Sequence, residues 1–376
     1  MLKTLQTLIE ASRSLSNSWI DSWKTKGYIL GYFCTHVPEE VVYAADILPV
    51  RIRATGCKET SLADAFLSSF NCSFVRCTLE VAMEKQYHFL DGIISCNSCD
   101  HVRRGYDVWK QKVGTPFKHF LQVPRIINDE AIETFTYEIT LLKERLEKHF
   151  NIDISEEKLW KAIKIYNDVR GLLKELYNIR KEGSPKISGT EFMGVVTAST
   201  AVPKHQLKLL LNQLLNELVS REGYSNYRAR ILVMGSLLDD PHYLEMIENM
   251  GGLVVADALC FGSRYFWDPV KESGDPIHNL AERYIKKVPC ARMIGEHDTR
   301  LQYVLDTIKE FDVEGVIFQR MKFCDFWGGE CFMFRRELKE RGIPFLELER
   351  EYILSGVEAA KTRIQAFLES IEARRL

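Results

Sequence analysis

The stretch YILGYFCTHVPEEVVYAADILPVRI, residues 28–52, contains two apolar runs separated by a segment that favours a helix. Tyr28 to Cys34 is short and uncharged, which is typical of a buried strand. Pro38 and the two glutamates after it then open a helix through Ala45, because proline fits the first turn and carboxylates favour the positive helix end. Leu48 to Ile52 is the next short strand. This order predicts parallel strands in a sheet that helices cover on both faces.

The same alternation of short apolar runs and helical segments continues along much of the chain. Further strands are predicted at residues 89–95 (FLDGIIS), 120–123, 230–235 (RILVMG), 253–257, 315–319 and 345–348. Helices are predicted at residues 1–16, 100–112 and 358–374. This alternation is typical of doubly wound sheets, which bind ligands at the carboxyl ends of their strands.

The middle of the chain has a different pattern. From Asn128 to Glu222, apolar residues recur at heptad-like spacing, and the one uncertain strand signal is Met193 to Val196. We therefore predict an α/β fold with two doubly wound parallel-sheet domains, of the Rossmann or flavodoxin-like kind, and a helical subdomain between them. The predicted domains are residues 1–127, which contain Cys72 and Cys99, residues 128–226, and residues 227–376, which contain Cys324.

Composition restricts the function and the compartment. The 376 residues include 50 basic and 52 acidic side chains, and the net charge of −2 argues against a dedicated nucleic-acid binder. No apolar run approaches the length of a membrane span, and the N-terminus lacks the features of a secretory signal. We therefore expect a cytoplasmic protein without a membrane anchor. In that reducing compartment the ten cysteines are core residues, metal ligands or catalytic thiols rather than disulfides.

Three cysteines stand at the predicted junctions of strands and helices. Cys72 precedes a helical stretch, Cys99 follows the strand FLDGIIS, and Cys324 follows the strand of residues 315–319. The N–H groups at a helix start stabilise thiolates and anionic clusters. Cys96 and Cys99 form a CxxC pair, which taken alone also allows a thioredoxin-like redox site or part of a zinc site. We interpret the remaining cysteines as core packing: Cys34, Cys57, Cys77, Cys260, Cys290 and Cys331.

Two charged segments lie close to these junctions. Arg103 and Arg104 come within about two helical turns of Cys99, where they can bind a phosphate or carboxylate. A surface ion pair with Asp100 or Asp107 is the alternative for one of the two. The segment from Glu347 to Tyr352 leaves a strand end as alternating charges. P-loop, HExxH, GxSxG and GxGxxG motifs are all missing from the sequence.

Several blocks together resemble the 2-hydroxyacyl-CoA dehydratase and benzoyl-CoA reductase family. The N-terminal blocks are Gly31 to Glu40, Ala44 to Arg51, Asn71 to Arg76 and Asn97 to Arg104. The C-terminal blocks are Phe323 to Asp325, Glu349 to Tyr352 and Thr362 to Phe367. The resemblance extends over nearly the whole chain.

The resemblance implies an oxygen-sensitive [4Fe–4S] cluster on Cys72, Cys99 and Cys324, with one iron that has no cysteine ligand. It also implies an acyl-CoA substrate and a paired subunit, either a homologous sister chain or a second copy of this chain. Electrons are expected from a separate ATP-dependent iron–sulfur activator protein, which accounts for the missing P-loop.

Several functions within this family stay open. The first hypothesis is radical dehydration of a 2-hydroxyacyl-CoA, with His36, Glu39 and Glu349 as candidate catalytic residues. The alternatives are ring reduction of the benzoyl-CoA reductase type, a double-cubane [8Fe–9S] reductase of small molecules, and a subunit that only relays electrons. The segment from Gly356 to Ala360 departs from the family's usual block, so the substrate class is undetermined.

Overall fold

Two four-stranded, all-parallel sheets organise the chain, and the computed structural model describes residues 2–353 and 356–375. The N-terminal sheet has the order β2-β1-β3-β4, and the C-terminal sheet has the order β6-β5-β7-β8. The strands of the first sheet are β1 (Ile29–Tyr32), β2 (Leu48–Arg51), β3 (Gly92–Cys96) and β4 (Phe117–Leu121). Those of the second are β5 (Ala229–Gly235), β6 (Gly252–Ala258), β7 (Gly315–Met321) and β8 (Phe345–Arg350).

Both sheets therefore repeat one topology, in which the first strand lies between the second and the third. The chain order reverses at β1 and β3 in one sheet and at β5 and β7 in the other. Crevices for ligands form outside the carboxyl ends of strands at such reversals. The predicted α/β fold of two parallel-sheet domains is confirmed.

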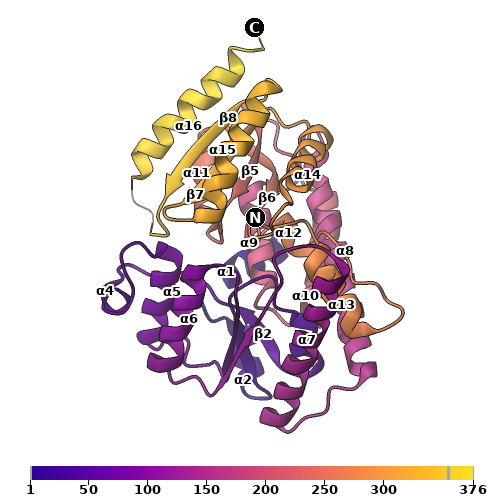
Figure 1. Cartoon of the computed structure of the whole chain (residues 1–376). Coiled ribbons are helices and arrows are strands. Elements are labelled where there is room, and N and C mark those ends of the chain that lie inside the picture. Colours follow the sequence, from indigo (N-terminus) through magenta and orange to yellow (C-terminus); the bar gives the residue numbers. More distant parts are fainter. Residues whose placement is uncertain (1, 354–355, 376) are drawn as a thin grey trace.

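Helices flank both sheets (Figure 1), and the chain between the last strand of the first sheet and the first strand of the second is helical. The N-terminal helices are α1 (Lys3–Ser12), α2 (Ser18–Lys24), α3 (Glu39–Ala44), α4 (Ser61–Asp64), α5 (Ser73–Met83) and α6 (Asp100–Lys112). The middle helices are α7 (Asp129–Phe150), α8 (Glu156–Asn178), the 3-10 turn η1 (Ile179–Lys181), α9 (Gly189–Ser199) and α10 (Lys204–Val219). The C-terminal helices are α11 (Pro241–Asn249), α12 (Ser263–Phe266), α13 (Pro276–Lys286), α14 (His297–Glu310), α15 (Asp325–Glu340) and α16 (Val357–Glu372).

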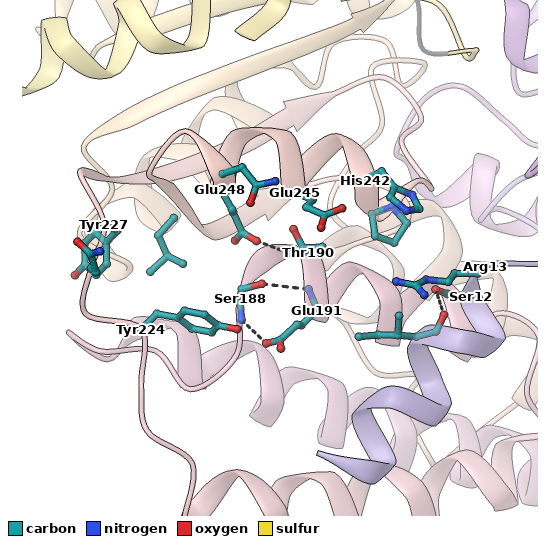
Figure 2. A pocket seen from close by; sticks show the side chains of 15 residues that line it. Ser12, Arg13, Ser188, Thr190, Glu191, Tyr224, Tyr227, His242, Glu245 and Glu248 are labelled. Atoms are coloured by element: carbon teal, nitrogen blue, oxygen red, sulfur yellow. Dashed lines mark hydrogen bonds between the residues drawn. The ribbon is translucent and has the colours of Figure 1, made fainter. Parts of the chain in front are cut away.

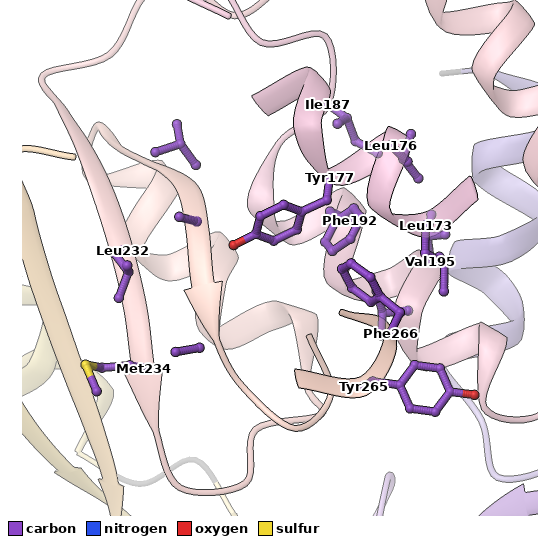
Figure 3. Close-up of a cluster of buried hydrophobic side chains, with 14 of the residues drawn as sticks. Leu173, Leu176, Tyr177, Ile187, Phe192, Val195, Leu232, Met234, Tyr265 and Phe266 are labelled. Carbon is purple, nitrogen blue, oxygen red and sulfur yellow. The ribbon is translucent and has the colours of Figure 1, made fainter. Parts of the chain in front are cut away.

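The middle helices share the cores of both sheets. Tyr177 of α8 contacts Phe192 of α9 and Phe266 of α12, with ring centroids 5.4 and 5.7 Å apart, and Leu232 of β5 belongs to the same core (Figure 3). Helix α7 instead packs with α13 in the core that contains strands β1 and β3. The division of the chain at residues 127 and 226 stays a prediction.

One predicted strand and the one uncertain strand signal of the middle region differ from the structure. Met193 to Val196 lies inside α9, which is buried on nearly every side and therefore has no polar face to reveal its helical period. The fourth strand begins at Phe117 rather than Phe120, because Phe117, His119 and Leu121 alternate toward the core and continue the pleat.

No helix in the described ranges has both the length and the apolar character that a bilayer crossing requires.

Candidate functional site

Three helices begin at a cysteine. Cys72 is the N-cap residue of α5, Cys99 that of α6, and Cys324 that of α15. The Cys99 sulfur accepts the N–H of Val102, three residues ahead, at 3.4 Å. Cysteine is not among the residues that usually cap helices, so its use at three helix starts indicates a role beyond helix stability.

Contacts between the two halves bring these helix starts together at the carboxyl edges of both sheets. The backbone N–H of Cys72 donates to Nδ1 of His101, two residues after Cys99, at 3.3 Å. The hydroxyl of Ser73 meets the sulfur of Met321, the last residue of β7, at 3.4 Å. The rings of Phe70 and Phe323 pack edge to face, with centroids 5.4 Å apart. The segments that carry Cys72, Cys99 and Cys324 are therefore neighbours in space.

The three thiols share one electrostatic environment. Burial raises the pKa of each of them, to about 11 for Cys99 and about 12 for Cys324. Repulsion from Cys99 and Cys324 raises the pKa of Cys72 further, and Cys99 does the same for Cys324. Backbone N–H groups of the helix that follows act in the opposite direction on each pKa. Cys72 and Cys324 therefore both lie within range of the charge of Cys99, and a bound cation would favour the thiolate form of all three.

Thiolate sulfur is the donor that iron–sulfur clusters use. Across the part of the chain that the structure describes, no three His, Cys, Asp or Glu side chains converge on one metal position. In an iron–sulfur cluster, by contrast, each cysteine binds a different iron, so the sulfurs need not meet at one point. All ten cysteines are unpaired, which leaves the three thiols free for such a group.

The turn before Cys324 is strained. Phe323 has a φ of 63°, a left-handed conformation that bulky side chains seldom adopt. Such outliers persist where the surrounding structure enforces them, often at functional sites. The turn from β7 into α15 thus positions Cys324 at a conformational cost.

His36 lies buried just after β1. Its Nδ1 is 3.2 Å from the carbonyl oxygen of Tyr284, so this nitrogen carries the proton, and Nε2 has no hydrogen-bond partner among the described residues. Burial, followed by the charges of Lys287 and Arg292, lowers the pKa of His36 well below its usual value. The ring is therefore neutral, with one free acceptor nitrogen.

Glu39 lies in α3 within a buried polar network. Its carboxylate accepts the hydroxyls of Tyr166 at 3.3 Å and Tyr265 at 3.1 Å, and Nζ of Lys204 is 3.4 Å away. These donors come from α8, α10 and α12, so the network joins the middle helices to both halves. These three contacts fix the position of the Glu39 carboxylate.

The other predicted polar residues are exposed. Arg104 pairs with Asp100 at 2.6 Å, as expected for one of the two arginines, and Arg103 beside it is exposed. Glu349 is paired with Arg320 at 2.5 Å on the outer part of β8. The catalytic and binding roles of these residues stay predictions.

Arg104 nevertheless borders a hollow next to the thiols. This hollow has a volume of about 480 Å³, and Asn71 and His101 also line it. Asn71 precedes Cys72, and His101 is two residues beyond Cys99.

Four buried cations around this site were not recognised from the sequence. They are Arg51, Arg264, Lys287 and Arg292. Basic residues are usually exposed, so the sequence alone does not indicate which ones are buried. The only signal in the sequence was the position of Arg51 at the end of a predicted strand and of Lys287 and Arg292 on either side of Cys290.

Another hollow, of about 340 Å³, lies between α1, α9 and α11 (Figure 2). Its polar groups mainly cap α9: Ser188 and Glu191 form a capping box, and Glu248 accepts the N–H of Gly189 at 2.8 Å. No cysteine lines it. These polar groups therefore stabilise the start of α9.

The fold and the site together define an α/β protein with two parallel sheets and a thiol site between their carboxyl edges. The chain belongs to the family described as 2-hydroxyglutaryl-CoA dehydratase, D-component, which matches residues 34–371. The resemblance inferred from the sequence is thereby confirmed.

Three curated relatives align along almost the full length of the chain. The (R)-phenyllactyl-CoA dehydratase beta subunit of Clostridium sporogenes is 27% identical over 91% of both chains. A benzoyl-CoA reductase subunit of Thauera aromatica is 25% identical over 92% of this chain and 91% of its own. The (R)-2-hydroxyglutaryl-CoA dehydratase beta subunit of Acidaminococcus fermentans is 25% identical over 98% of this chain and 100% of its own. These relatives are named as subunits of dehydratases and of a reductase, so family membership indicates an enzyme.

Proposed function

We propose that the chain is the iron–sulfur subunit of an enzyme that dehydrates a 2-hydroxyacyl-CoA. The observation that supports this proposal is that Cys72, Cys99 and Cys324 each begin a helix and that the segments carrying them are neighbours. Family membership and the dehydratase relatives support the reaction type.

The three thiolates would hold a [4Fe–4S] cluster, with one iron lacking a cysteine ligand. When bound, such a cluster supplies a one-electron redox centre and a Lewis-acidic iron. The chain contributes the three sulfurs, the N–H groups of α5, α6 and α15 that favour their thiolate forms, and the partly buried position.

His36 is the residue that we assign to proton handling. Because Nδ1 donates to Tyr284, the ring orientation is fixed and Nε2 can accept a hydrogen bond or a proton. The lowered pKa keeps this acceptor neutral at physiological pH. Glu39 and Glu349 stay secondary candidates, since Glu39 has three donors of its own and Glu349 is exposed.

Arg103 and Arg104 are proposed to bind an anionic group of the substrate, such as a phosphate of coenzyme A. Support comes from the hollow beside Cys72 and Cys99, which Arg104 lines. The ion pair with Asp100 is exposed, so its loss to a phosphate would cost little.

We also propose a sister subunit or a second copy of this chain as partner, and a separate ATP-dependent activator as electron source. The relatives are named as single subunits of larger enzymes, which supports the first of these partners. A reducing cytoplasm would suit a site of free thiols.

Reduction of benzoyl-CoA is the second candidate, because the benzoyl-CoA reductase relative aligns with the chain as extensively as the dehydratases do. Anaerobic EPR spectra of the reduced protein, with and without acyl-CoA, would separate these functions. We expect a 2-hydroxyacyl-CoA such as lactoyl-CoA to change the spectrum and free CoA to leave it unchanged. A change with benzoyl-CoA alone would favour the reductase. No change with any acyl-CoA would contradict substrate binding at this cluster and indicate an electron relay.

A further inference from the structure

Four buried cations lie at the carboxyl edges of the sheets without a carboxylate partner. Arg51, Arg264, Lys287 and Arg292 are each at most 5% exposed. No carboxylate oxygen of the described residues lies within 4.0 Å of their charged nitrogens. The Nε atoms of the three arginines also have no hydrogen-bond partner in the described ranges.

Four other buried cations of the chain have a carboxylate partner. Arg170 pairs with Glu40, Arg180 with Asp257, Lys204 with Glu39 and Arg300 with Glu330. In the described ranges, Arg53, Arg230, Arg283 and Arg350 are also buried without such a pair, and they donate mainly to backbone carbonyls. The Nε atoms of Arg230, Arg283 and Arg350 each have an acceptor. Arg51, Arg264 and Arg292 differ from all of these, because each combines the lack of a carboxylate partner with a buried Nε that has no hydrogen-bond partner among the described residues. Lys287 shares the lack of a carboxylate partner within the same ranges.

Each of the four contacts a segment that carries a cysteine. Arg51, the last residue of β2, donates to the carbonyl oxygen of Cys260 at 2.5 Å and lies 3.1 Å from its sulfur. Nζ of Lys287 donates to the carbonyl of Thr35, which follows Cys34.

The other two cations contact segments that adjoin the proposed cluster ligands. Arg292 donates to the carbonyl of Val123 at 2.9 Å and to that of Asn97, inside the CxxC segment, at 3.5 Å. The guanidinium of Arg264 lies 5.0 Å from the ring centroid of Trp327, in the first turn of α15 after Cys324. The cations thus approach the thiol site from β2, α12 and the segment after α13.

An uncompensated buried cation destabilises a fold, because it loses its hydration without gaining an opposite charge. Carbonyl oxygens and aromatic faces compensate only part of this loss. Four such groups around one site therefore indicate a negatively charged ligand that the polypeptide itself does not provide. Three cysteine thiolates and their iron–sulfur cluster would be such a ligand.

We propose that Arg51, Arg264, Lys287 and Arg292 form a cation cage that balances the negative charge of the cluster and raises its reduction potential. This inference rests on the proposed function, since it assumes the cluster on Cys72, Cys99 and Cys324. Adding an electron makes the cluster more negative, so nearby cations stabilise the reduced state more than the oxidised one. The four are positioning residues that act through the cluster.

The first test measures the reduction potential of the anaerobically purified protein by EPR-monitored titration. We expect a more negative potential in Arg264→Met and in Lys287→Met, with iron content retained. Arg264→Lys should restore a potential close to that of the wild type, because it keeps the charge. Lys148→Met, an exposed change outside the site, is the matched control and should leave the potential unchanged. Equal potentials in wild type and both methionine variants would overturn the cage.

The second test needs no cluster. In urea, the iron-free Arg264→Met protein should unfold at a higher denaturant concentration than the iron-free wild type, because an uncompensated charge is removed. Arg170→Met, which removes a paired cation, should shift the transition in the opposite direction. A loss of stability in Arg264→Met as large as that in Arg170→Met would contradict the cage. If the wild type binds no iron or sulfide, the proposed function fails, while this stability test still decides whether the four cations lack a counter-charge.

Discussion

Cys72, Cys99 and Cys324 occupy positions where serine, threonine, aspartate or asparagine usually caps a helix. Their location at strand-to-helix junctions could be predicted from the sequence, because short apolar runs ended just before two of them. Their approach in space could not, since it depends on contacts such as that between Phe70 and Phe323. The sequence therefore predicts the local position of each cysteine but not how the three segments pack together.

The buried cations are residues whose position could not be predicted from the sequence at all. Arg264 and Arg292 resemble ordinary surface residues in the sequence, because a long charged side chain is usually solvated. Only packing of segments distant in the sequence removes them from water. The most unusual electrostatic feature of the site was therefore invisible before the fold was known.

His119 offers a prediction at this scale. It lies on β4, is 4% exposed, and neither ring nitrogen has a partner among the described residues. Burial, followed by the charge of Arg145, lowers the pKa of His119 from 6.5 to about 4. In the unfolded chain this histidine is protonated below pH ~6.5, whereas in the folded chain it stays neutral down to pH ~4. The free energy of unfolding therefore decreases as the pH falls through this window.

We expect the free energy of unfolding of the iron-free protein to lose about 3 kcal/mol from this residue between pH 7 and pH 4. His119→Leu should remove that part of the slope, as measured by urea unfolding at several pH values. His88→Leu, which changes an exposed histidine, is the control and should keep the wild-type slope. A slope in His119→Leu that equals that of the wild type would disprove this assignment.

At the scale of single elements, the βαβ pattern of residues 28–52 predicted β1, α3 and β2 with small shifts at their ends. Helix α6 was predicted with the ends that it has, Asp100 and Lys112. The error at Met193 to Val196 has a physical cause: α9 is enclosed by α1, α11 and β6, so apolar residues occupy every side of it. Hydrophobic periodicity identifies helices and strands that have one solvent-exposed face, and it does not identify those that are buried on all sides.

The start of α9 gives a prediction about packing. A Cβ on Gly189 would lie 2.5 Å from Cβ of Val254 and 2.6 Å from its carbonyl oxygen, because α9 rests directly on β6. We expect Gly189→Ala to lower the free energy of unfolding by about 1–3 kcal/mol through overpacking.

Gly171 is the matched control, since it also lies within a helix but a Cβ added there would have nothing within 4 Å. Gly171→Ala should raise stability by about 0.5–1 kcal/mol, because alanine favours helices. Urea unfolding of both variants would check the signs. Equal changes in the free energy of unfolding in the two variants would contradict overpacking against Val254.

At the scale of the whole molecule, buried charges connect the two halves. Arg170 of α8 pairs with Glu40 of α3, and the Tyr284 hydroxyl of α13 donates to Glu40 at 2.8 Å. Burial acts to raise the pKa of Glu40, but Arg170 and Arg283 outweigh it and hold that pKa below the usual value. The partners are 130 or more residues apart, so hydrophobic patterning could predict both sheets but not this junction.

We expect Arg170→Met to lower the free energy of unfolding by about 3–5 kcal/mol, because it leaves Glu40 as an uncompensated buried charge. Glu40→Gln combined with Arg170→Met should recover much of that loss. A double-mutant cycle in urea measures the coupling. Additive effects of the two substitutions would show that the pair does not act as a unit.

The proposed function depends on three thiols that share one inorganic cofactor. Iron and acid-labile sulfide should be counted in the anaerobically purified chain and in its Cys99→Ser and Cys290→Ser variants. We predict about four of each per chain in the wild type, little change in Cys290→Ser, and loss of most iron in Cys99→Ser. About twice that content would indicate a double cubane. Full iron retention in Cys99→Ser, or a wild-type chain without iron and sulfide, would contradict the central claim.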